Sequence, residues 1–265
     1  MKFEDKVSKL RIKKHQGKET KEFLEDVVTL AQGEALEYIL GEVDFCGTKV
    51  DLSLRPMIPR PETEHWVKQV IDNRQPLDPA QGKQTTDTKI ATKKLRVLDL
   101  FSGSGCVGLS VLKNIPDAHV TFVEVDEKSR EQIDISLRKN TIDTTRAEVV
   151  IEDCVPFLKR ASALQKWDAV FAVPPYVPRA MQDEVMEELH AEDPLFFFDR
   201  DDGYYYHKQV LAHAKELLVD GGTLYLEFDI IQRETIEQLA KDYDYKNFSF
   251  LQDPYGHECV ITLNE

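Results

Sequence analysis

Cysteine is scarce in this sequence, and its four copies are widely spaced. They form no CxxC pair, which argues against a zinc ribbon or a disulfide scaffold and is typical of a reducing compartment. No stretch approaches the roughly 18 consecutive apolar residues of a membrane-spanning helix, so we expect no membrane partner. Hydrophobic residues make up 42% of the chain and charged residues 31%, which excludes a mostly disordered or collagen-like protein.

Basic residues are also fewer than acidic residues. Lys and Arg number 34 against 48 Asp and Glu, which gives a net charge of −14 and a pI near 5.0. A chain this acidic is a poor candidate for holding a long duplex through its phosphates, so we expect no direct nucleic-acid partner. Residues 1–21 are basic and residues 181–205 are strongly acidic. We interpret both as solvated faces, although the acidic segment is also suited to repelling or steering partners. Met1 is not followed by an apolar core, so no secretory signal is expected.

The pattern of apolar residues divides the chain into four parts. Residues 1–41 carry apolar residues at helical spacing and predict a short helical region. Residues 42–71 begin with an alternating pattern that predicts a β-hairpin and continue into a connector. Residues 72–94 are polar, with almost no apolar side chains, and are typical of a linker. Residues 95–265 form the main domain.

Strand-like and helix-like segments alternate in the main domain, which predicts βαβ units and a parallel sheet with helices on both faces. Two final runs, Asn247–Leu251 and Glu258–Leu263, lie a short turn apart, so they can only pair antiparallel. The predicted fold is therefore α/β: a seven-stranded sheet with a closing hairpin, which resembles the class I (Rossmann-like) methyltransferases. The earlier strand-like runs are Leu95–Leu100, Val120–Val125, Val149–Ile151, Ala169–Val173 and Thr223–Phe228.

A glycine-rich turn, Phe101–Gly105, follows the first strand of the main domain. Glycines let the backbone approach a ligand closely and point amide groups at it. With Gly108, the turn also fits the dinucleotide pattern GxGxxG, although a plain tight turn would show the same residues. We expect the cofactor contacts of this turn to come from Phe101, Ser102, Gly103, Ser104 and Gly105.

Acidic residues follow the next two strands. Asp126 is placed to accept hydrogen bonds from both ribose hydroxyls of a nucleoside, or else to cap the next helix. Asp153 and Cys154 end the third strand, which lies beside the adenine in methyltransferase sheets. Asp153 is suited to accept from the adenine amine and Cys154 to pack on the ring, but a capping Asp beside a buried Cys fits equally well. With the glycine turn, this pattern predicts a nucleoside cofactor.

The fourth strand ends in Val173, Pro174, Pro175 and Tyr176. Proline cannot donate to the strand ladder, so the strand stops here, at the ligand edge of the sheet. The rigid corner would point backbone carbonyls and an aromatic ring towards a bound cofactor. A strand that simply ends at proline, with a packed tyrosine, explains the same residues.

These segments together resemble the HemK/PrmC family, the protein-(glutamine-N5) methyltransferases of class I peptide-chain release factors. The most specific match is Ile58–Glu64, which reads IPRPETE and contains the PRPETE hallmark of the family. The resemblance covers the chain from about Gly33 to the end. Its other segments are Tyr38–Gly41 with Phe45 and Gly47, the Phe101–Gly105 turn, Val173–Tyr176 at the family's NPPY motif, Asp193–Leu195 near its EP pair, and Tyr255–Glu258 in its closing hairpin.

The resemblance implies S-adenosyl-L-methionine as cofactor and a class I release factor as protein partner. It implies that Arg60 and Glu62 line the mouth of the site, although acids at a proline-started helix are also ordinary dipole chemistry. In the family, the Asn side chain and the first Pro carbonyl hold the substrate amide, and the Tyr ring packs over it. Val173 stands where the family has Asn and offers no acceptor, whereas Pro174 and Tyr176 are present.

Other functions stay open on the sequence alone. Val173 favours a catalytically impaired or non-enzymatic relative. An adenine-N6 nucleic-acid methyltransferase shares the Pro-Pro-Tyr logic but needs base flipping and a basic surface. A nicotinamide-binding enzyme rests on GxGxxG alone. Glu227 either faces the site or is solvated, and we interpret His65, His207 and His257 as structural. The long insert at 72–94 favours a mitochondrial location, with a cytoplasmic one as the alternative.

Overall fold

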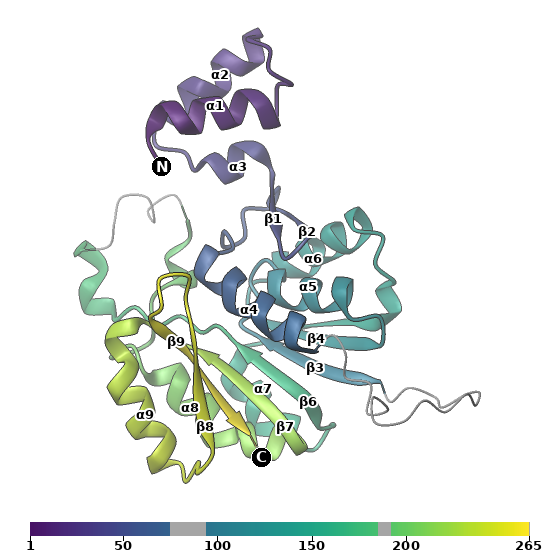
Figure 1. The fold of residues 1–265 in the computed structure, drawn as a ribbon, viewed down its shortest axis with the longest axis vertical. Helices are drawn as coiled ribbons and strands as arrows, with labels where there is room; N and C mark the ends of the chain where they lie inside the picture. The colour runs from purple at the N-terminus through teal and green to yellow at the C-terminus, as the bar shows by residue number, and fades with distance from the viewer. Residues whose placement is uncertain (75–93, 185–191, 265) are drawn as a thin grey trace.

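A seven-stranded mixed sheet forms the centre of the protein (Figure 1). The computed structural model describes residues 1–74, 94–184 and 192–264. The strand order is β5-β4-β3-β6-β7-β9-β8, with β3 to β7 parallel and β9 antiparallel to both β7 and β8. This confirms the predicted sheet and its closing hairpin. The strands are β3 (Leu95–Leu100), β4 (Ala118–Glu124), β5 (Ala147–Ile151), β6 (Trp167–Ala172), β7 (Leu218–Glu227), β8 (Phe248–Gln252) and β9 (Glu258–Asn264).

Helices cover both faces of the sheet, as Figure 1 shows. Apolar side chains of α4 (Pro61–Arg74), α5 (Cys106–Asn114) and α6 (Lys128–Lys139) enter one buried cluster. Those of α7 (Cys154–Ala161), α8 (Tyr205–Leu217) and α9 (Arg233–Asp242) enter the other. The central strands β3 and β6 are apolar and buried along most of their length because helices pack on each face of them.

The order of the strands reverses between β3 and β6, since β4 pairs on one side of β3 and β6 on the other. Leu100 is in register with Val123 of β4 and with Ala172 of β6, so these three strands end at the same level. In open α/β sheets, ligands bind in the crevice at such a switch point, outside the carboxyl ends of the strands. The turns after β3, β4 and β6 therefore meet at this edge.

A two-stranded hairpin, β1 (Glu42–Phe45) and β2 (Thr48–Asp51), packs on the main domain together with α4. Phe45 and Trp66 are buried in the same cluster as α5 and α6. The Asp51 amide also donates to Ser136 of α6 at 3.0 Å. Physically, residues 42–71 therefore share the core of the main domain. Residues 72–74 of the predicted linker form the end of α4, and residues 75–93 lie outside the described part of the chain.

Three helices at the amino end have a small core of their own. They are α1 (Phe3–Lys13), α2 (Lys21–Ala31) and α3 (Leu36–Leu40), and they stand apart from the sheet in Figure 1. Their buried cluster consists of Leu10, Phe23, Leu30, Leu36 and Ile39. None of the described helices is long and apolar enough to cross a membrane.

Candidate functional site

A pocket opens at the carboxyl edge of the sheet, where the predicted segments after four strands meet. We call it the strand-end pocket. Its wall combines Phe101 and Gly103 after β3, Glu124 of β4, Asp153 and Cys154 after β5, and Val173 and Pro175 after β6, with Met57, Leu195, Phe196 and Tyr206 closing it. The structure thus brings together residues from the three predicted ligand-binding segments.

The backbone of the glycine turn adopts conformations that side chains usually avoid. Phe101, Gly103 and Gly105 all have positive φ, at 58°, 52° and 79°. A Cβ atom on Gly105 would lie 2.7 Å from Cγ1 of Ile133, so this position also requires glycine for space. Phe101 carries the strain of a non-glycine residue at positive φ, a feature concentrated at functional sites.

Hydrogen bonds hold the turn in place from beneath. The Gly108 amide donates to the Asp99 carboxylate at 2.9 Å, and burial raises the pKa of Asp99 to about 7. The Ser102 hydroxyl donates to the Asp99 carbonyl at 2.7 Å, so it stabilises the turn from within. Ser104 is buried and lines a second pocket on the side of α4, which we call the adjoining pocket. Its wall also includes Met57, Arg60, Thr63 and Val173. The turn is therefore preorganised by its own contacts.

The acidic residue of β4 that lines the pocket is Glu124; Asp126 does not line it, and its contact with a ribose stays a prediction. Glu124 is buried and accepts a hydrogen bond from the Gly103 amide at 2.8 Å. Burial raises the pKa of this carboxyl. Asp126 accepts from the Lys128 amide at 3.0 Å at the start of α6, so the capping alternative describes its contact. The prediction extended the strand to Val125, whereas β4 ends at Glu124.

Asp153 and Cys154 line the pocket and also begin α7. The Asp153 carboxylate accepts from the Val155 amide at 2.8 Å as a helix cap, and it forms an ion pair with Arg200. Cys154 is buried, and burial raises the pKa of its thiol well above the usual value. Cys154 is therefore a neutral, apolar part of the wall. Capping leaves both side chains at the pocket, so their predicted contacts with an adenine ring stay a prediction.

The Pro-Pro-Tyr corner follows the last residue of β6. Val173 is half-buried and lines both the strand-end pocket and the adjoining pocket, while Pro174 is buried and Pro175 lines the strand-end pocket. The Tyr176 ring lies 6.4 Å from the His207 ring, between centroids, and Tyr176 does not line either pocket. Burial raises its pKa. Val173 therefore belongs, with Met57, Phe101 and Gly103, to the wall that the two pockets share.

The segment that resembles PRPETE lies on the other side of Val173, in the adjoining pocket. Arg60 donates to the Glu192 carboxylate at 2.6 Å, and the Ile58 amide donates to its second oxygen at 2.7 Å. Glu192 is buried and lies more than a hundred residues from Arg60 in the sequence. Its carboxylate holds the Arg60 guanidinium in place. No local pattern in the sequence indicates this contact, because the two residues are 132 positions apart. Glu62 is exposed and lines neither pocket.

Glu227 at the end of β7 is neither solvated nor part of the two pockets. Its carboxyl is buried and accepts from the Thr63 hydroxyl at 2.8 Å and the Trp66 indole at 2.6 Å, which ties α4 to the sheet. Burial raises its pKa to about 7. His207 is buried against the Glu227 carbonyl at 2.9 Å, and burial lowers the pKa of its ring to about 4, in line with a structural role. Within the described ranges, no group of three potential ligands could hold a metal ion.

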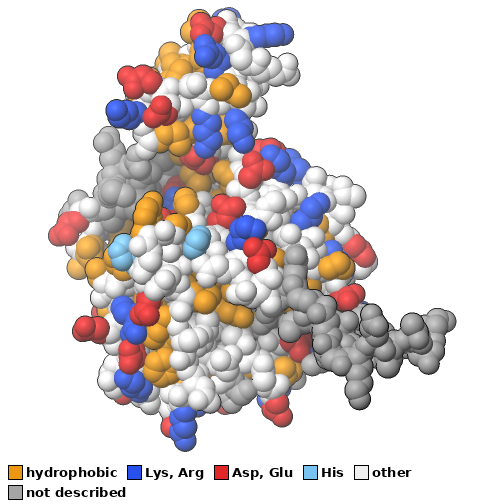
Figure 2. Space-filling model, in the orientation of Figure 1, with side chains coloured by type: hydrophobic (Ala, Val, Ile, Leu, Met, Phe, Trp, Pro, Cys, Tyr) orange, Lys and Arg blue, Asp and Glu red, His pale blue; other side chains and the backbone are white. Residues whose placement is uncertain are grey.

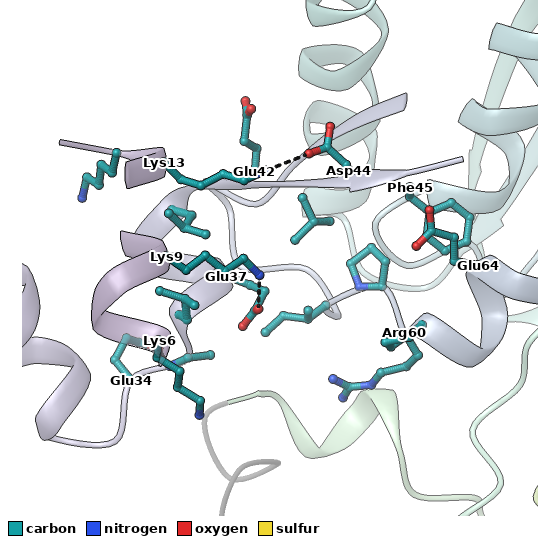
Figure 3. Close-up of a pocket in the computed structure, with 18 of the residues that line it drawn as sticks. Lys6, Lys9, Lys13, Glu34, Glu37, Glu42, Asp44, Phe45, Arg60 and Glu64 are labelled. Atoms are coloured by element: carbon teal, nitrogen blue, oxygen red, sulfur yellow. Dashed lines mark hydrogen bonds and ion pairs between the residues drawn. The ribbon is translucent and has the colours of Figure 1, made fainter. Parts of the chain in front are cut away.

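A wider cleft separates the amino-terminal helices from the main domain, and it is visible as a hollow in Figure 2. Figure 3 shows lysines of α1 on one side and Arg60 with Glu64 on the other. Lys9 pairs with Glu37 at 3.8 Å and Lys13 with Asp44 at 3.4 Å. The first pair lies within the amino-terminal helices, and the second joins α1 to β1. Arg60 and Glu192 line the cleft as well, so it reaches the adjoining pocket.

The strand-end pocket fits S-adenosyl-L-methionine. Positive-φ glycines, a buried carboxylate at the end of β4 and an acid with a soft neutral side chain after β5 suit a nucleoside with an adenine ring. The seven-stranded sheet and this pocket together define an S-adenosylmethionine-dependent methyltransferase.

Comparisons with known proteins agree. A family model described as "Conserved hypothetical protein 95" matches residues 83–197. The release factor glutamine methyltransferase of Flavobacterium psychrophilum is 29% identical over 242 residues, which cover 90% of this chain and 78% of that protein. The protein of the same name from Streptococcus pneumoniae is 28% identical over 254 residues, which cover 93% of this chain and 81% of that protein. The solved structure of a methyltransferase from Pyrococcus furiosus shares the fold, with a TM-score of 0.51, 12% identity and coverage of 82% of this chain and 89% of its own. The resemblance to the HemK/PrmC family is thereby confirmed.

Proposed function

We propose that this protein transfers a methyl group from S-adenosyl-L-methionine to the side-chain amide nitrogen of the glutamine in the Gly-Gly-Gln motif of a class I release factor. The observation that carries the proposal is the position of Val173 between two pockets. The strand-end pocket is lined by residues that follow β3, β4, β5 and β6. The adjoining pocket is lined by the segment around Arg60 and, on its other side, by the glycine turn. A substrate side chain entering past Arg60 would reach the cofactor at this strand end.

The names of the two relatives support the acceptor. Both are called release factor glutamine methyltransferases, and both align with about nine-tenths of this chain. The physical requirements of the reaction support it too. A side-chain amide is a weak nucleophile because its nitrogen lone pair is delocalised, so catalysis consists mainly of positioning and electrostatics. The site offers a rigid corner and buried anchors that suit this task.

The residues of the chain would divide the work in a simple way. When bound, S-adenosyl-L-methionine supplies the electrophilic methyl group. The Pro174 carbonyl accepts one hydrogen of the substrate amide and orients its nitrogen. The Glu192–Arg60 pair, at 2.6 Å, keeps the rim of the adjoining pocket in one geometry. Apolar neighbours such as Met57 and Val173 exclude water from the space between.

The proposal is tested by transfer of a radiolabelled methyl group to a release factor that contains Gly-Gly-Gln. The matched control is the same release factor with that glutamine changed to glutamate. Label in the first protein alone supports the proposal. Label in DNA or RNA, and none in either release factor, overturns it and favours the adenine-N6 alternative. We propose a protein acceptor rather than nucleic acid because the chain carries a net charge of −14.

A second candidate function is that of an impaired or non-enzymatic relative that binds the cofactor. The observation in its favour is Val173 itself, which lines the boundary of both pockets without any hydrogen-bond acceptor. Cofactor binding by calorimetry together with no label in the release factor supports this candidate. As to compartment, we propose a mitochondrial location with a cytoplasmic one as the alternative, and fractionation of cells with an antibody to the chain tests it.

A further inference from the structure

Arg200 connects separate parts of the strand-end pocket, although no sequence motif pointed to it. Its guanidinium forms an ion pair with the Asp153 carboxylate at the start of α7. The same guanidinium lies 5.5 Å from the ring centroids of both Tyr205 and Tyr206 at the start of α8. Asp153 and Tyr206 are both in the wall of the pocket. The Arg200 side chain therefore connects the starts of α7 and α8.

This connection extends to the glycine turn through an aromatic contact. The Tyr206 ring meets the Phe101 ring edge-on, with centroids 5.1 Å apart and planes at 70°. Phe101 is the strained residue of the turn, at φ 58°. Edge-to-face pairs of this kind favour one ring orientation. Arg200 thus acts on the turn after β3 through Tyr206 and on the start of α7 directly.

The backbone that carries Arg200 is held firmly. Asp199 is buried, and its carboxylate accepts from the Gly203 amide at 2.9 Å and the Tyr205 amide at 3.2 Å. Val177, just after the Pro-Pro-Tyr corner, bridges to Phe198 as an isolated pair of residues in strand conformation. The Asp199 amide donates to the Val177 carbonyl at 2.8 Å. Arg200 is therefore presented from a fixed position, which is what a positioning residue requires.

We propose that Arg200 is a positioning residue that holds Asp153 and Tyr206 as one wall of the cofactor pocket, at the end that takes the adenine ring. A carboxylate has about four acceptor sites, so Asp153 can keep its helix cap and its ion pair and still accept from a ligand amine. The guanidinium fork orients this carboxylate, and the stacked tyrosine closes the wall beside it. The inference rests on the cofactor, and it does not depend on the methyl acceptor.

The test compares two arginines at the same pocket. Arg160 pairs with Glu152, another residue of the wall, and lies over Phe157 of its own helix. In Arg200→Met we expect the Kd for S-adenosylhomocysteine, measured by calorimetry, to rise about tenfold, the usual size of a lost charge-assisted contact. Arg160 is as exposed as Arg200, but its contacts are with Glu152 and Phe157, so Arg160→Met leaves the Asp153 and Tyr206 wall in place and we expect a change of less than about twofold. An unchanged Kd in Arg200→Met, or the same rise in both variants, overturns the proposal.

Further readouts separate positioning from a general structural role. Arg200→Lys keeps the charge but not the planar fork, and we expect it to restore only part of the affinity. Asp153→Asn keeps an acceptor for the helix cap, and Arg200→Met combined with it should cost no more than the larger single change. Additive losses, or a lowered thermal midpoint in Arg200→Met, would refute the assignment. Because no release factor is present, failure of the proposed methyl acceptor leaves this result intact.

Discussion

The two sides of Val173 differ in how completely they are built. On the cofactor side, Glu124 accepts a hydrogen bond from the glycine turn, and Asp153 forms an ion pair with Arg200. On the acceptor side, Arg60 is anchored by Glu192, but Val173 brings only methyl groups to the point where a substrate amide must be held. From this difference we expect cofactor binding and methyl transfer to depend on partly separate residues at one strand end. Substitutions on one side should then change one property more than the other.

The largest expected effect comes from giving the acceptor side its missing group. Valine and asparagine are close in volume, so Val173→Asn should fit without large repacking. We expect the single-turnover rate of release-factor methylation to rise by about 10² or more, since one preorganised partner contributes about this much. The Kd for S-adenosylmethionine should stay nearly unchanged. Equal rates in the two proteins would show that another group holds the glutamine. No activity in either would favour the non-enzymatic candidate.

The next effect concerns the cofactor side. In Glu124→Gln we expect the Kd for S-adenosylmethionine to rise by about tenfold, because glutamine has one acceptor oxygen where the two oxygens of Glu124 accept from the Gly103 and Val125 amides. Asp126→Asn is the matched control, since Asp126 contacts the Lys128 amide at the start of α6. It should change the Kd by less than about threefold. Calorimetry on both variants measures the two Kd values. A larger rise in Asp126→Asn than in Glu124→Gln would identify Asp126 as the ribose acceptor.

A smaller expected effect is the pH dependence of the free energy of unfolding. Glu227 anchors α4 on the acceptor side, and burial raises its pKa to about 7, above the usual 4.5. A carboxyl whose pKa is higher in the folded chain contributes stability below pH 4.5 that is lost as the pH rises through about 7. Glu227→Gln stays neutral and keeps an acceptor for Trp66, so its free energy of unfolding should fall less between these pH values. Denaturant titrations at pH 5 and 8 measure this.

The same pH experiment has a counterpart on the cofactor side. The pKa of Asp99 is also raised to about 7 by burial, and its carboxylate accepts from the Gly108 amide. Asp99→Asn should likewise reduce the loss of stability with rising pH. The Glu227 variant should leave the cofactor Kd unchanged at each pH. Identical pH profiles for Glu227→Gln and the unmodified protein would contradict the buried, neutral state of this carboxyl.

The smallest effect is expected at the rim of the acceptor side. Glu192→Gln weakens the hold on Arg60 and should lower methylation severalfold, by about 1 kcal/mol of positioning, with no change in the cofactor Kd. Glu62→Gln is the control, because Glu62 is exposed and lines neither pocket. It should change the rate by less than about twofold. A larger loss in Glu62→Gln would place that residue in contact with the substrate, as the resemblance implied.

By itself, the sequence determined the sheet, its closing hairpin and the location of the pocket. Alternating apolar segments and the turn at Phe101–Gly105 follow from local chemistry, because strand pattern, glycine conformations and proline breaks are properties of neighbouring residues. The Val173 corner was visible for the same reason. The resemblance to a family supplied the proposed acceptor and the proposed roles of Arg60 and Tyr176.

Only the tertiary structure decided which carboxylate faces the pocket and which distant groups support it. Glu124 and Asp126 lie two residues apart, and the point where β4 ends selects between them. Glu192 reaches Arg60 and Arg200 reaches Asp153 across separations of 132 and 47 residues. No local pattern encodes such pairs, because a buried or bridging charge is specified by what surrounds it after folding rather than by its neighbours in the chain.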